Sequence, residues 1–580
     1  MVFTELIQRT LESISEQISH IHTGEAIIFD IAVILIISAV LAFIARVLRQ
    51  PLIPAYVITG VIIGPLFLSL IGQPELISAF SEIGIAFLLF TAGLEISFRK
   101  IKEANIRKIL LIGVLQVGII FAISYFLGGY FNLTPLQAAY IGIILSFGST
   151  MVDIKLLSDT GKIVTLHGRI VIGILLLQDL VAIIAIMIFT SGGSAFMPVF
   201  YSFLKLFAIV IFSIFLQKFI LNKTFRFAAS STELLFLFSL AILFLFIMLS
   251  YVSGISIVIG AFIAGVSLAN SPFKTELESR IYPLRDFFAI LFFVALGMQV
   301  VFVGIENRLP LLIALLIGAM ILKPLITFIL LRTTGYRPRT SFLTSTSLAQ
   351  LSEFSLIIGM LGVSLGAISP PIFSTVILAT IITMSLTPYF IQYGERTYKL
   401  FRHPINLFKF LPIKENLGYD HEGKKEVLLI GAHRMGALLL KELLRKKSKL
   451  VVIDYNPEII SPLIKKKVAC IYGDITSPEL LHKVKIKNLK MAVSTVPGFE
   501  ENLYILNEIK KANPKVKVIL TGSRISETLK LYEAGADYVI TPKVIAGIKI
   551  ARILHSETPR LKRLKQKHLR RLNNIHKLLY

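Results

Sequence analysis

Long apolar runs follow one another through the first two thirds of the chain. Thirteen of them can be drawn, at residues 26–48, 52–72, 80–98, 107–130, 136–154, 168–190, 197–221, 232–250, 252–270, 286–304, 309–332, 341–364 and 370–393. At a rise of 1.5 Å per residue, about twenty helical residues cross a bilayer core of about 30 Å. The pattern predicts a polytopic α-helical membrane protein with about thirteen spans.

The run 168–190 is interrupted near its midpoint by Gln178 and Asp179. An ionisable carboxylate at the centre of a span costs at least about 2.5–3.5 kcal/mol and persists where it faces a cavity, a partner or a pathway. When ionised it attracts a small cation, and when protonated it is neutral, so the two ligands compete. We predict that Asp179 is the transport site; a structural acid bonded to a neighbouring helix is the alternative.

Positive charge sets the orientation. The chain has 580 residues, 55% of them hydrophobic, and a formal net charge of +25. Lys and Arg concentrate in every second connection between the runs, which is typical of cytoplasmic loops. This predicts a protein of the cell membrane with residues 1–25 outside, spans within 26–393, and the remainder in the cytoplasm. The first 25 residues lack the apolar core of a cleaved signal peptide.

An internal repeat is visible among the runs. Residues 57–64 resemble 258–265, and residues 86–92 resemble 289–295, with an offset of about 201 to 203 positions. The offset equals seven spans, which predicts two halves of opposite orientation, as in many secondary transporters. It also pairs Ser149 with Ser352, so we expect both spans to be discontinuous and to cross beside Asp179. Small residues that only permit tight packing are the alternative.

Other charges in the apolar runs have two interpretations each. Glu353 is a second site carboxylate or gate residue, or one half of a buried pair. Lys323 neutralises a carboxylate in one transport state, or caps carbonyls at a proline kink. Asp153 coordinates the cation, or marks the cytoplasmic end of its span. Glu95 and Asp30, near span ends, are expected at the membrane interface.

Six segments together resemble the monovalent cation:proton antiporter-2 family, especially its potassium efflux (Kef) type. They are LRQPLIPAYVITGVIIGP, SEIGIAFLLFTAGLEIS, FGSTMVDIKLLSDTG, HGRIVIGILLLQDLVAI, LFFVALGM and SLAQLSEFSLI. The resemblance implies a thirteen-helix sodium/proton-antiporter fold, a homodimer, and a core domain that moves against a dimerisation domain.

The same resemblance implies roles for single residues. Asp179 binds cation and proton alternately, and the neutral Gln178 beside it implies electroneutral, one-for-one exchange. Ser149 and Thr150 form the unwound-helix site, and Glu353 is the acid of the twelfth-helix motif. Asp153 stands where the family has an apolar or small residue, so it is expected to affect cation preference or stoichiometry.

After a linker at 394–423, residues 424–550 have the pattern of a soluble α/β domain. Strands are predicted at 426–430, 450–454, 468–472, 491–495, 516–521 and 537–541. They indicate a Rossmann half-domain. The predicted phosphate loop consists of Gly431, Ala432, His433, Arg434, Met435 and Gly436, with His433 in place of the second glycine of the usual fingerprint. The spacing along the sequence from Gly431 to Asp454 is the one expected for an acid that binds the ribose.

This region resembles the TrkA-N half of regulators of potassium conductance, with IDYNPE and YGDITSPELL as matching segments. The resemblance implies an adenine nucleotide, AMP, ADP or NAD(H), with Asp454 at the ribose and Asp474 near the base. A fold kept for dimerisation, with an empty pocket, is the alternative. The basic tail 551–580 predicts adsorption to anionic lipid; nucleic-acid binding has no further support.

We therefore predict a secondary transporter, not an enzyme, that exchanges a monovalent cation for protons under control of the nucleotide domain. K⁺ is favoured over Na⁺. A ligand-gated potassium channel is the first alternative, but no TVGYG filter loop occurs. An NAD-dependent membrane oxidoreductase is the second alternative, but no substrate domain is visible in the sequence beside the Rossmann region.

Overall fold

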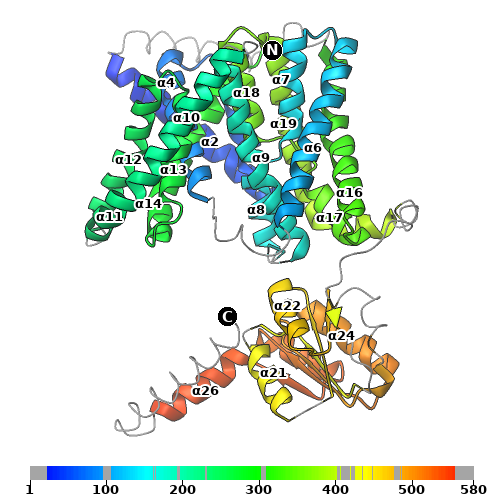
Figure 1. Cartoon of the computed structure of the whole chain (residues 1–580). Helices are drawn as coiled ribbons and strands as arrows, with labels where there is room; N and C mark the ends of the chain where they lie inside the picture. The colour runs from blue at the N-terminus through cyan, green and yellow to red at the C-terminus, as the bar shows by residue number, and fades with distance from the viewer. Residues whose placement is uncertain are drawn as a thin grey trace, which may run out of the picture. The chain divides into compact units, whose positions relative to one another are not determined.

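A computed structural model gives the fold of the chain (Figure 1). It describes residues 23–95, 106–160, 162–163, 165–191, 196–228, 231–301, 308–401, 405, 418–419, 425–433, 435–446, 449–473, 475, 484 and 486–554. The chain divides into two compact units, whose main ranges are Met1–Ile163 with His167–Lys414, and Glu415–Tyr580. The domain boundaries drawn from the sequence remain predictions.

The regular elements in the described residues of the first unit are all helices. Its helices are α2 (Thr23–Val47), α3 (Leu52–Ile63), α4 (Pro74–Glu95), α6 (Ile106–Leu127), α7 (Pro135–Ser146), α8 (Thr150–Asp159), α9 (Leu166–Thr190), α10 (Phe196–Leu216), α11 (Asn222–Ala228), α12 (Thr232–Val252), α13 (Ile257–Leu268), α14 (Lys274–Met298), α15 (Leu309–Ile317), α16 (Lys323–Thr333), α17 (Pro338–Ser347), α18 (Glu353–Ser364) and α19 (Pro370–Leu400). Two π-helical turns, Gln217–Leu221 and Gly318–Leu322, join α10 to α11 and α15 to α16.

Each of the thirteen apolar runs overlaps one helix or a consecutive pair of helices. Within the described residues, nine helical segments are long and apolar enough to cross a membrane. The other runs contain the short apolar helices α3, α13 and α18, and the helix α4. The helical prediction is confirmed, and the short helices are where irregular backbone replaces a continuous span.

The repeat predicted from the sequence is present in the helix bounds. Pro135 and Pro338 begin α7 and α17, which are 203 residues apart, and the breaks that follow end at Ser149 and Ser352. The prediction of paired discontinuous helices is therefore confirmed. An interrupted helix at each of these positions exposes free helix ends inside the unit.

The register of the repeat in α3 and α13 differs from the one predicted. Both helices have 12 residues, and their starts lie 205 positions apart, which pairs Gly60, not Gly64, with Gly265. A Cβ on Gly60 would lie 2.0 Å from Val294 O in α14, and one on Gly265 would lie 2.0 Å from Phe90 O in α4. The same glycine-mediated crossing thus occurs twice, and the one-turn error arose because apolar residues align almost equally well in either register.

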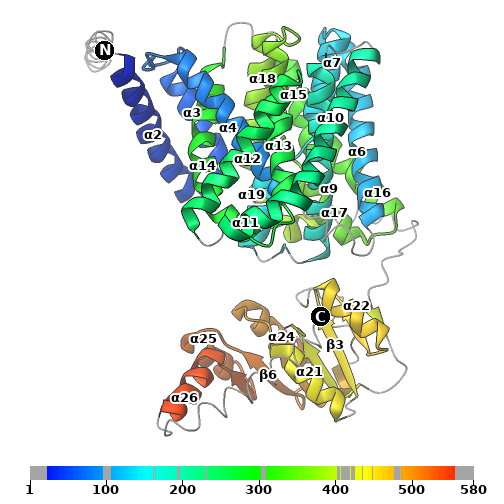
Figure 2. The ribbon, with the colours of Figure 1, turned by 60° about the vertical axis from the view of Figure 1, so that its left-hand side comes forward.

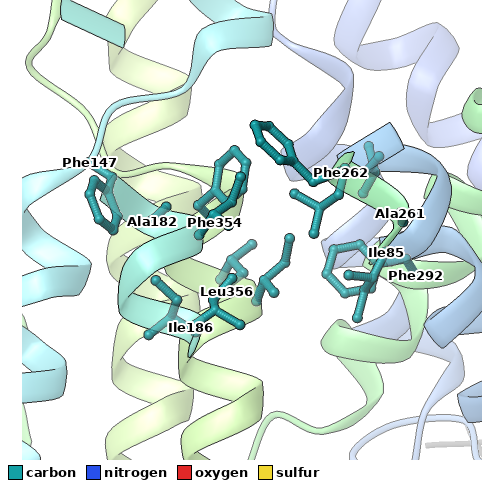
Figure 3. Close-up of a cluster of buried hydrophobic side chains, with 14 of the residues drawn as sticks. Ile85, Phe147, Ala182, Ile186, Ala261, Phe262, Phe292, Phe354 and Leu356 are labelled. Atoms are coloured by element: carbon teal, nitrogen blue, oxygen red, sulfur yellow. The ribbon is translucent and has the colours of Figure 1, made fainter. Parts of the chain in front are cut away.

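The helices of the first unit form two groups. The first helix group is α2, α3, α4 and α10 to α14, and the second is α6 to α9 with α15 to α19; the views in Figures 1 and 2 show them beside each other. A cluster of apolar side chains lies at the boundary between the groups (Figure 3). There Phe354 and Ala182 of the second group face Phe262 and Phe292 of the first.

The second unit contains a seven-stranded sheet. Its strands are β1 (Gly418–Tyr419), β2 (Val427–Ile430), β3 (Leu450–Asp454), β4 (Cys470–Tyr472), β5 (Met491–Ser494), β6 (Lys517–Thr521) and β7 (Tyr538–Ile540), in the order β1-β4-β3-β2-β5-β6-β7. All neighbouring pairs are parallel except β1 with β4. The helices are α21 (Met435–Arg445), α22 (Pro457–Lys465), α24 (Phe499–Ala512), α25 (Ile525–Glu533) and α26 (Pro542–Leu554).

This strand order corrects one prediction and confirms the others. The six predicted strands are present, and their order is that of both mononucleotide-binding halves of a doubly wound sheet, not of a half-domain. β1 was not predicted, since it lies within the expected linker. Separate apolar clusters cover the two faces, one around Leu428 and Ile453 and the other around Leu429 and Val452.

The sheet edge at β7 carries a network of ion pairs with a testable pH dependence. Asp537 accepts hydrogen bonds from Lys510 Nζ at 2.7 Å, the Val518 N–H at 2.8 Å and Lys517 Nζ at 3.0 Å. Burial raises the pKa of Asp537, but these three donors outweigh it and hold the pKa well below its usual range. The stabilisation is therefore complete above the unfolded pKa of about 4 and is lost as the pH falls below it.

At pH values under about 4, we expect the melting temperature of a fragment carrying the second unit to decrease. Asp537→Asn should flatten part of that decline, while Glu533→Gln, at an exposed acid of α25, should leave it unchanged. Circular dichroism melts between pH 2.5 and pH 7 would measure this. An equally steep decline in Asp537→Asn would show that other carboxylates are responsible.

Candidate cation and proton site

The two helix breaks meet inside the second helix group. Ser149 caps α8 by accepting a hydrogen bond from the Val152 N–H at 3.3 Å, and Ser352 caps α18 by accepting one from the Phe354 N–H at 3.1 Å. Gln350 joins the breaks, because its Nε2 donates to Ser149 O at 3.3 Å. The predicted crossing of the two segments is observed.

Lys323 lies where the two C-terminal half-helix ends leave free carbonyls. Its Nζ donates to Phe147 O at 2.7 Å and to Gln350 O, and its side chain is fully buried. The negative ends of α7 and α17 therefore share one ammonium group. Capping freed carbonyls was one of the two interpretations of this lysine, and it is the contact observed here.

Asp179 and Gln178 face different surroundings in α9. The Thr150 hydroxyl donates to the Asp179 carboxylate, at 3.2 Å from Oδ1 and 3.0 Å from Oδ2. Gln178 Oε1 accepts a hydrogen bond from the Gly148 N–H at 2.8 Å, and its Nε2 donates to Gln116 Oε1 at 3.0 Å. Gln178 thus bonds the break between α7 and α8 to α9 and α6. Asp179 contacts Thr150, the first residue of α8.

A cavity of about 30 Å³ opens beside Asp179 at the boundary between the two helix groups. Thr150, Glu353, Glu95 and Arg285 line it together with Asp179 and apolar side chains of α4 and α18. Because one water needs about 10–15 Å³ of such space, the cavity has room for a cation with about one water. Carboxylate and hydroxyl oxygens are suitable ligands for a hard cation.

Glu353 is the first residue of α18 and is buried. Its Oε2 has no hydrogen-bond partner among the described residues. A buried carboxylate oxygen without a donor is costly unless it carries a proton or contacts a cation. The open oxygen therefore fits either ligand of an exchanger.

Two residues of the cavity wall, Glu95 and Arg285, were not assigned to the site from the sequence. The Tyr282 hydroxyl donates to Glu95 Oε1 at 3.2 Å, and the Arg285 guanidinium lies over the Tyr282 ring, 4.4 Å from its centroid. Glu95 was expected only to be interfacial, and Arg285 lies between the runs 252–270 and 286–304, in one of the connections where Lys and Arg concentrate. The spacing of four residues from Thr91, on the same helix face and also in the cavity wall, is the signal that could have identified Glu95.

Asp153 is fully buried but does not line this cavity. Its Oδ1 accepts a hydrogen bond from Gln350 Nε2 at 3.0 Å. It does not mark an exposed span end, and it does not share the cavity wall with Asp179. The other acid expected at the interface, Asp30, is also fully buried, and it accepts hydrogen bonds from the Gly72 and Gln73 N–H groups.

In the second unit, two glycines shape the loop between β2 and α21. Gly431 has φ of +79°, and a Cβ on Gly436 would lie 2.1 Å from Gly431 O. His433 is exposed within the loop, and Met435 begins α21. The loop lies at the switch point between β2 and its neighbours β3 and β5, where doubly wound sheets bind ligands.

Asp454, at the end of β3, accepts hydrogen bonds from backbone N–H groups of the second unit. Its Oδ2 accepts from the Ala432 N–H at 2.7 Å and its Oδ1 from the Asn456 N–H at 2.8 Å. Burial raises the pKa of Asp454, and these two hydrogen bonds oppose the shift. The carboxylate therefore shapes the loop whether or not its remaining lone pairs bind a ribose. Arg434 and Asp474 lie outside the described residues.

The paired broken helices and the buried acid between them define the class, a secondary antiporter of monovalent cations and protons. Residues 31–392 match the family described as sodium/hydrogen exchanger, transmembrane, and the chain belongs to that family. Residues 427–542 match the TrkA-N domain. The antiporter resemblance and the fold class predicted from the sequence are confirmed.

Curated relatives and a solved structure agree with this assignment. The glutathione-regulated potassium-efflux system protein KefC of Salmonella heidelberg (strain SL476) is 28% identical over 492 residues, which cover 83% of this chain and 77% of the relative. KefC of Escherichia coli (strain K12) is 28% identical over 493 residues with the same coverage. The sodium proton antiporter MjNhaP1 of Methanocaldococcus jannaschii shares the fold, with a TM-score of 0.51 and 17% identity over 67% of this chain and 99% of that chain.

Proposed function

We propose that the chain exchanges K⁺ for H⁺ at Asp179. The observation that carries this is the buried carboxylate at a cavity of cation size, bonded to Thr150 at the start of a broken helix. Ionised, Asp179 holds the cation with the help of Thr150 and Glu353; protonated, it is neutral and releases it. K⁺ is favoured over Na⁺ because the curated relatives are named for potassium efflux.

The exchange is one K⁺ for one proton. Of the pair on α9, Asp179 reaches the cavity, whereas Gln178 is neutral and engaged with Gly148 and Gln116. One carboxylate that alternates between the two ligands moves no net charge. Asp153 does not enter this count, since it is outside the cavity wall.

Access alternates by movement of one helix group against the other. This is supported by the position of the cavity at their boundary, with α4 and α14 on one side and α8, α9 and α18 on the other. The side chains labelled at this boundary in Figure 3 are apolar and their contacts non-directional, while two hydrogen bonds, from the Val301 N–H to Ser374 Oγ and from Gln50 Nε2 to the Tyr389 hydroxyl, also link residues beside α14 and α3 to α19. The helix breaks and Asp179 belong to the same group, so they travel together.

The second unit binds an adenine nucleotide, AMP, ADP or NAD(H), and biases the transport states. Support comes from the match to the TrkA-N domain and from the tight loop Gly431–Gly436 at the switch point of the sheet. We further propose a homodimer in the cell membrane, with the N-terminus outside and the second unit in the cytoplasm. Lys and Arg in alternate connections support this orientation.

The deciding experiment uses proteoliposomes with a pH dye inside. Adding K⁺ or Na⁺, with and without a clamped membrane potential, should show K⁺-driven proton movement that the clamp does not alter. A cation flux that follows the potential without moving protons would indicate a channel instead. A proton flux that changes with the clamp would refute the one-for-one stoichiometry.

Glu95 provides a separate test of the cavity. Glu95→Gln removes a negative charge from the wall but keeps the acceptor for Tyr282, so it should weaken K⁺ binding by about 1.4 kcal/mol, or about tenfold in apparent KM. Maximal exchange should change much less. Glu233→Gln, at an exposed acid of α12, is the matched control. An unchanged KM in Glu95→Gln would remove Glu95 from the site.

A further inference from the structure

Two opposite charges are buried at the crossing of the broken helices, and neither lines the cavity of Asp179. The side chains of Asp153 and Lys323 are each 0% exposed. A buried charge is costly unless another charge or several hydrogen bonds compensate it. The question is what compensates each of these two.

Lys323 has no direct carboxylate partner among the described residues. Its ammonium donates to two backbone carbonyl oxygens, Phe147 O and Gln350 O. Two carbonyls supply only the partial negative charge of the helix ends, roughly half an elementary charge each. An ammonium also has three N–H groups, and these contacts use two of them.

Gln350 connects the lysine to the acid. Its backbone carbonyl accepts from Lys323 Nζ, and its side-chain Nε2 donates to Asp153 Oδ1 at 3.0 Å. Positive and negative groups are thus bound to opposite ends of one residue. The same Nε2 donates to Ser149 O at 3.3 Å, next to the residue that contacts Asp179.

Two oxygen atoms at this point have no partner in the described part of the chain. They are Asp153 Oδ2 and Gln350 Oε1, and both are buried. As with Glu353 Oε2, a buried carboxylate oxygen without a donor is costly unless it carries a proton or faces a cation, and the Lys323 ammonium is a buried cation that acts on Asp153. If Asp153 is ionised, its negative charge and the positive charge of Lys323, which has an unused N–H, compensate each other.

We propose that Asp153 is the buried counter-charge of Lys323, joined to it through Gln350, and that the pair positions the start of α8 against Asp179. The position usually available for a second acid on α9 is occupied by Gln178, which is engaged with other groups. Asp153 is therefore a positioning residue and not a ligand of the transported cation. The charge pairing is independent of transport, whereas its effect on exchange rests on the proposed function.

The pairing is tested by melting four full-length proteins in detergent: wild type, Asp153→Asn, Lys323→Met and the double variant. Asp153→Asn keeps an acceptor for Gln350 but leaves the lysine charge uncompensated, so its melting temperature should fall by several degrees. The double variant should melt higher than Asp153→Asn, because removal of the lysine charge relieves that cost. Additive losses would overturn the proposal.

Asp30→Asn is the matched control. Asp30 is another wholly buried acid of the membrane unit, but its oxygens accept from the backbone N–H groups of Gly72 and Gln73. Combined with Lys323→Met, it should show additive losses. Rescue of Asp30→Asn by Lys323→Met would mean that the lysine substitution stabilises the protein in general, which would also overturn the specific pairing.

Exchange kinetics separate a positioning role from a ligand role. In proteoliposomes, Asp153→Asn should lower the maximal rate by about tenfold and change the apparent KM for K⁺ by less than about twofold. A rise in KM comparable to that of Glu95→Gln would make Asp153 a cation ligand and overturn the assignment. If wild type itself shows no exchange, the proposed function fails, while the melting result still decides the charge pairing.

The proposal remains testable if Asp153→Asn cannot be purified. In that case it requires the double variant to be recovered as folded dispersed protein by size-exclusion chromatography, because both charges are then absent. Recovery of Lys323→Met alone, together with loss of the double variant, would overturn it.

Discussion

Asp179→Asn is expected to abolish K⁺-driven proton movement while the protein remains folded. The amide has nearly the same size and can still accept the Thr150 hydrogen bond, but it carries no charge and binds no proton near neutral pH. At an effective dielectric constant of 20, unit charges 4 Å apart attract by about 4 kcal/mol, so K⁺ binding should weaken about 1,000-fold. Proton release is lost at the same time.

The measurement is the pH change inside proteoliposomes after K⁺ addition, with the melting temperature as a check on folding. Asp159→Asn is the control, since Asp159 is an exposed acid at the end of α8. It should exchange at the wild-type rate. Proton-coupled flux in Asp179→Asn would show that the proton and the cation bind elsewhere.

Gly436→Asp is expected to eliminate nucleotide binding by the second unit. Any Cβ at this position lies 2.1 Å from Gly431 O, so the loop must shift, and the new carboxylate would repel a phosphate at the start of α21. Both effects act on the same ligand. We expect the affinity for AMP, ADP or NADH to fall at least about 100-fold, or about 2.7 kcal/mol.

Isothermal titration of the full-length protein with each nucleotide measures this loss. Gly547→Asp adds the same carboxylate to α26, where a new Cβ meets no atom within 4 Å, and it should bind as wild type does. Unchanged affinity in Gly436→Asp would place the ligand at another site. Weak affinity in both the wild type and the control would favour an empty pocket.

The sequence contained enough information for the helical unit and for the broken pair. The length of an apolar run identifies a span because the bilayer thickness fixes how many residues must cross it. The repeat offset that relates Ser149 to Ser352 was supported by polar residues that interrupt both runs. The register of α3 against α13 was missed by four residues. In an apolar stretch the turns of a helix differ mainly in which one carries the glycine at a helix crossing. The sequence does not show which glycine this is until the helix that crosses it is known.

The site was predictable in part for a similar reason. Asp179 is conspicuous because a charge at the centre of a span needs an explanation. Gln350 is not, because its importance lies in joining Asp153 to Lys323, residues that are far from each other along the chain. Asp454 was assigned to a ligand by its spacing, and its contacts to Ala432 and Asn456 depend on how the loop folds back.

The apolar boundary between the helix groups links this protein to its lipids. Within a bilayer, acyl chains are as apolar as Phe262 or Phe354, so these contacts gain little from the exclusion of water and are held by close fit. Lipid tails can replace such contacts with small loss, whereas they cannot replace the hydrogen bonds of Gln350. The thickness and acyl packing of the host membrane should therefore set how readily the two groups shift, and so the exchange rate, without altering the chemistry at Asp179.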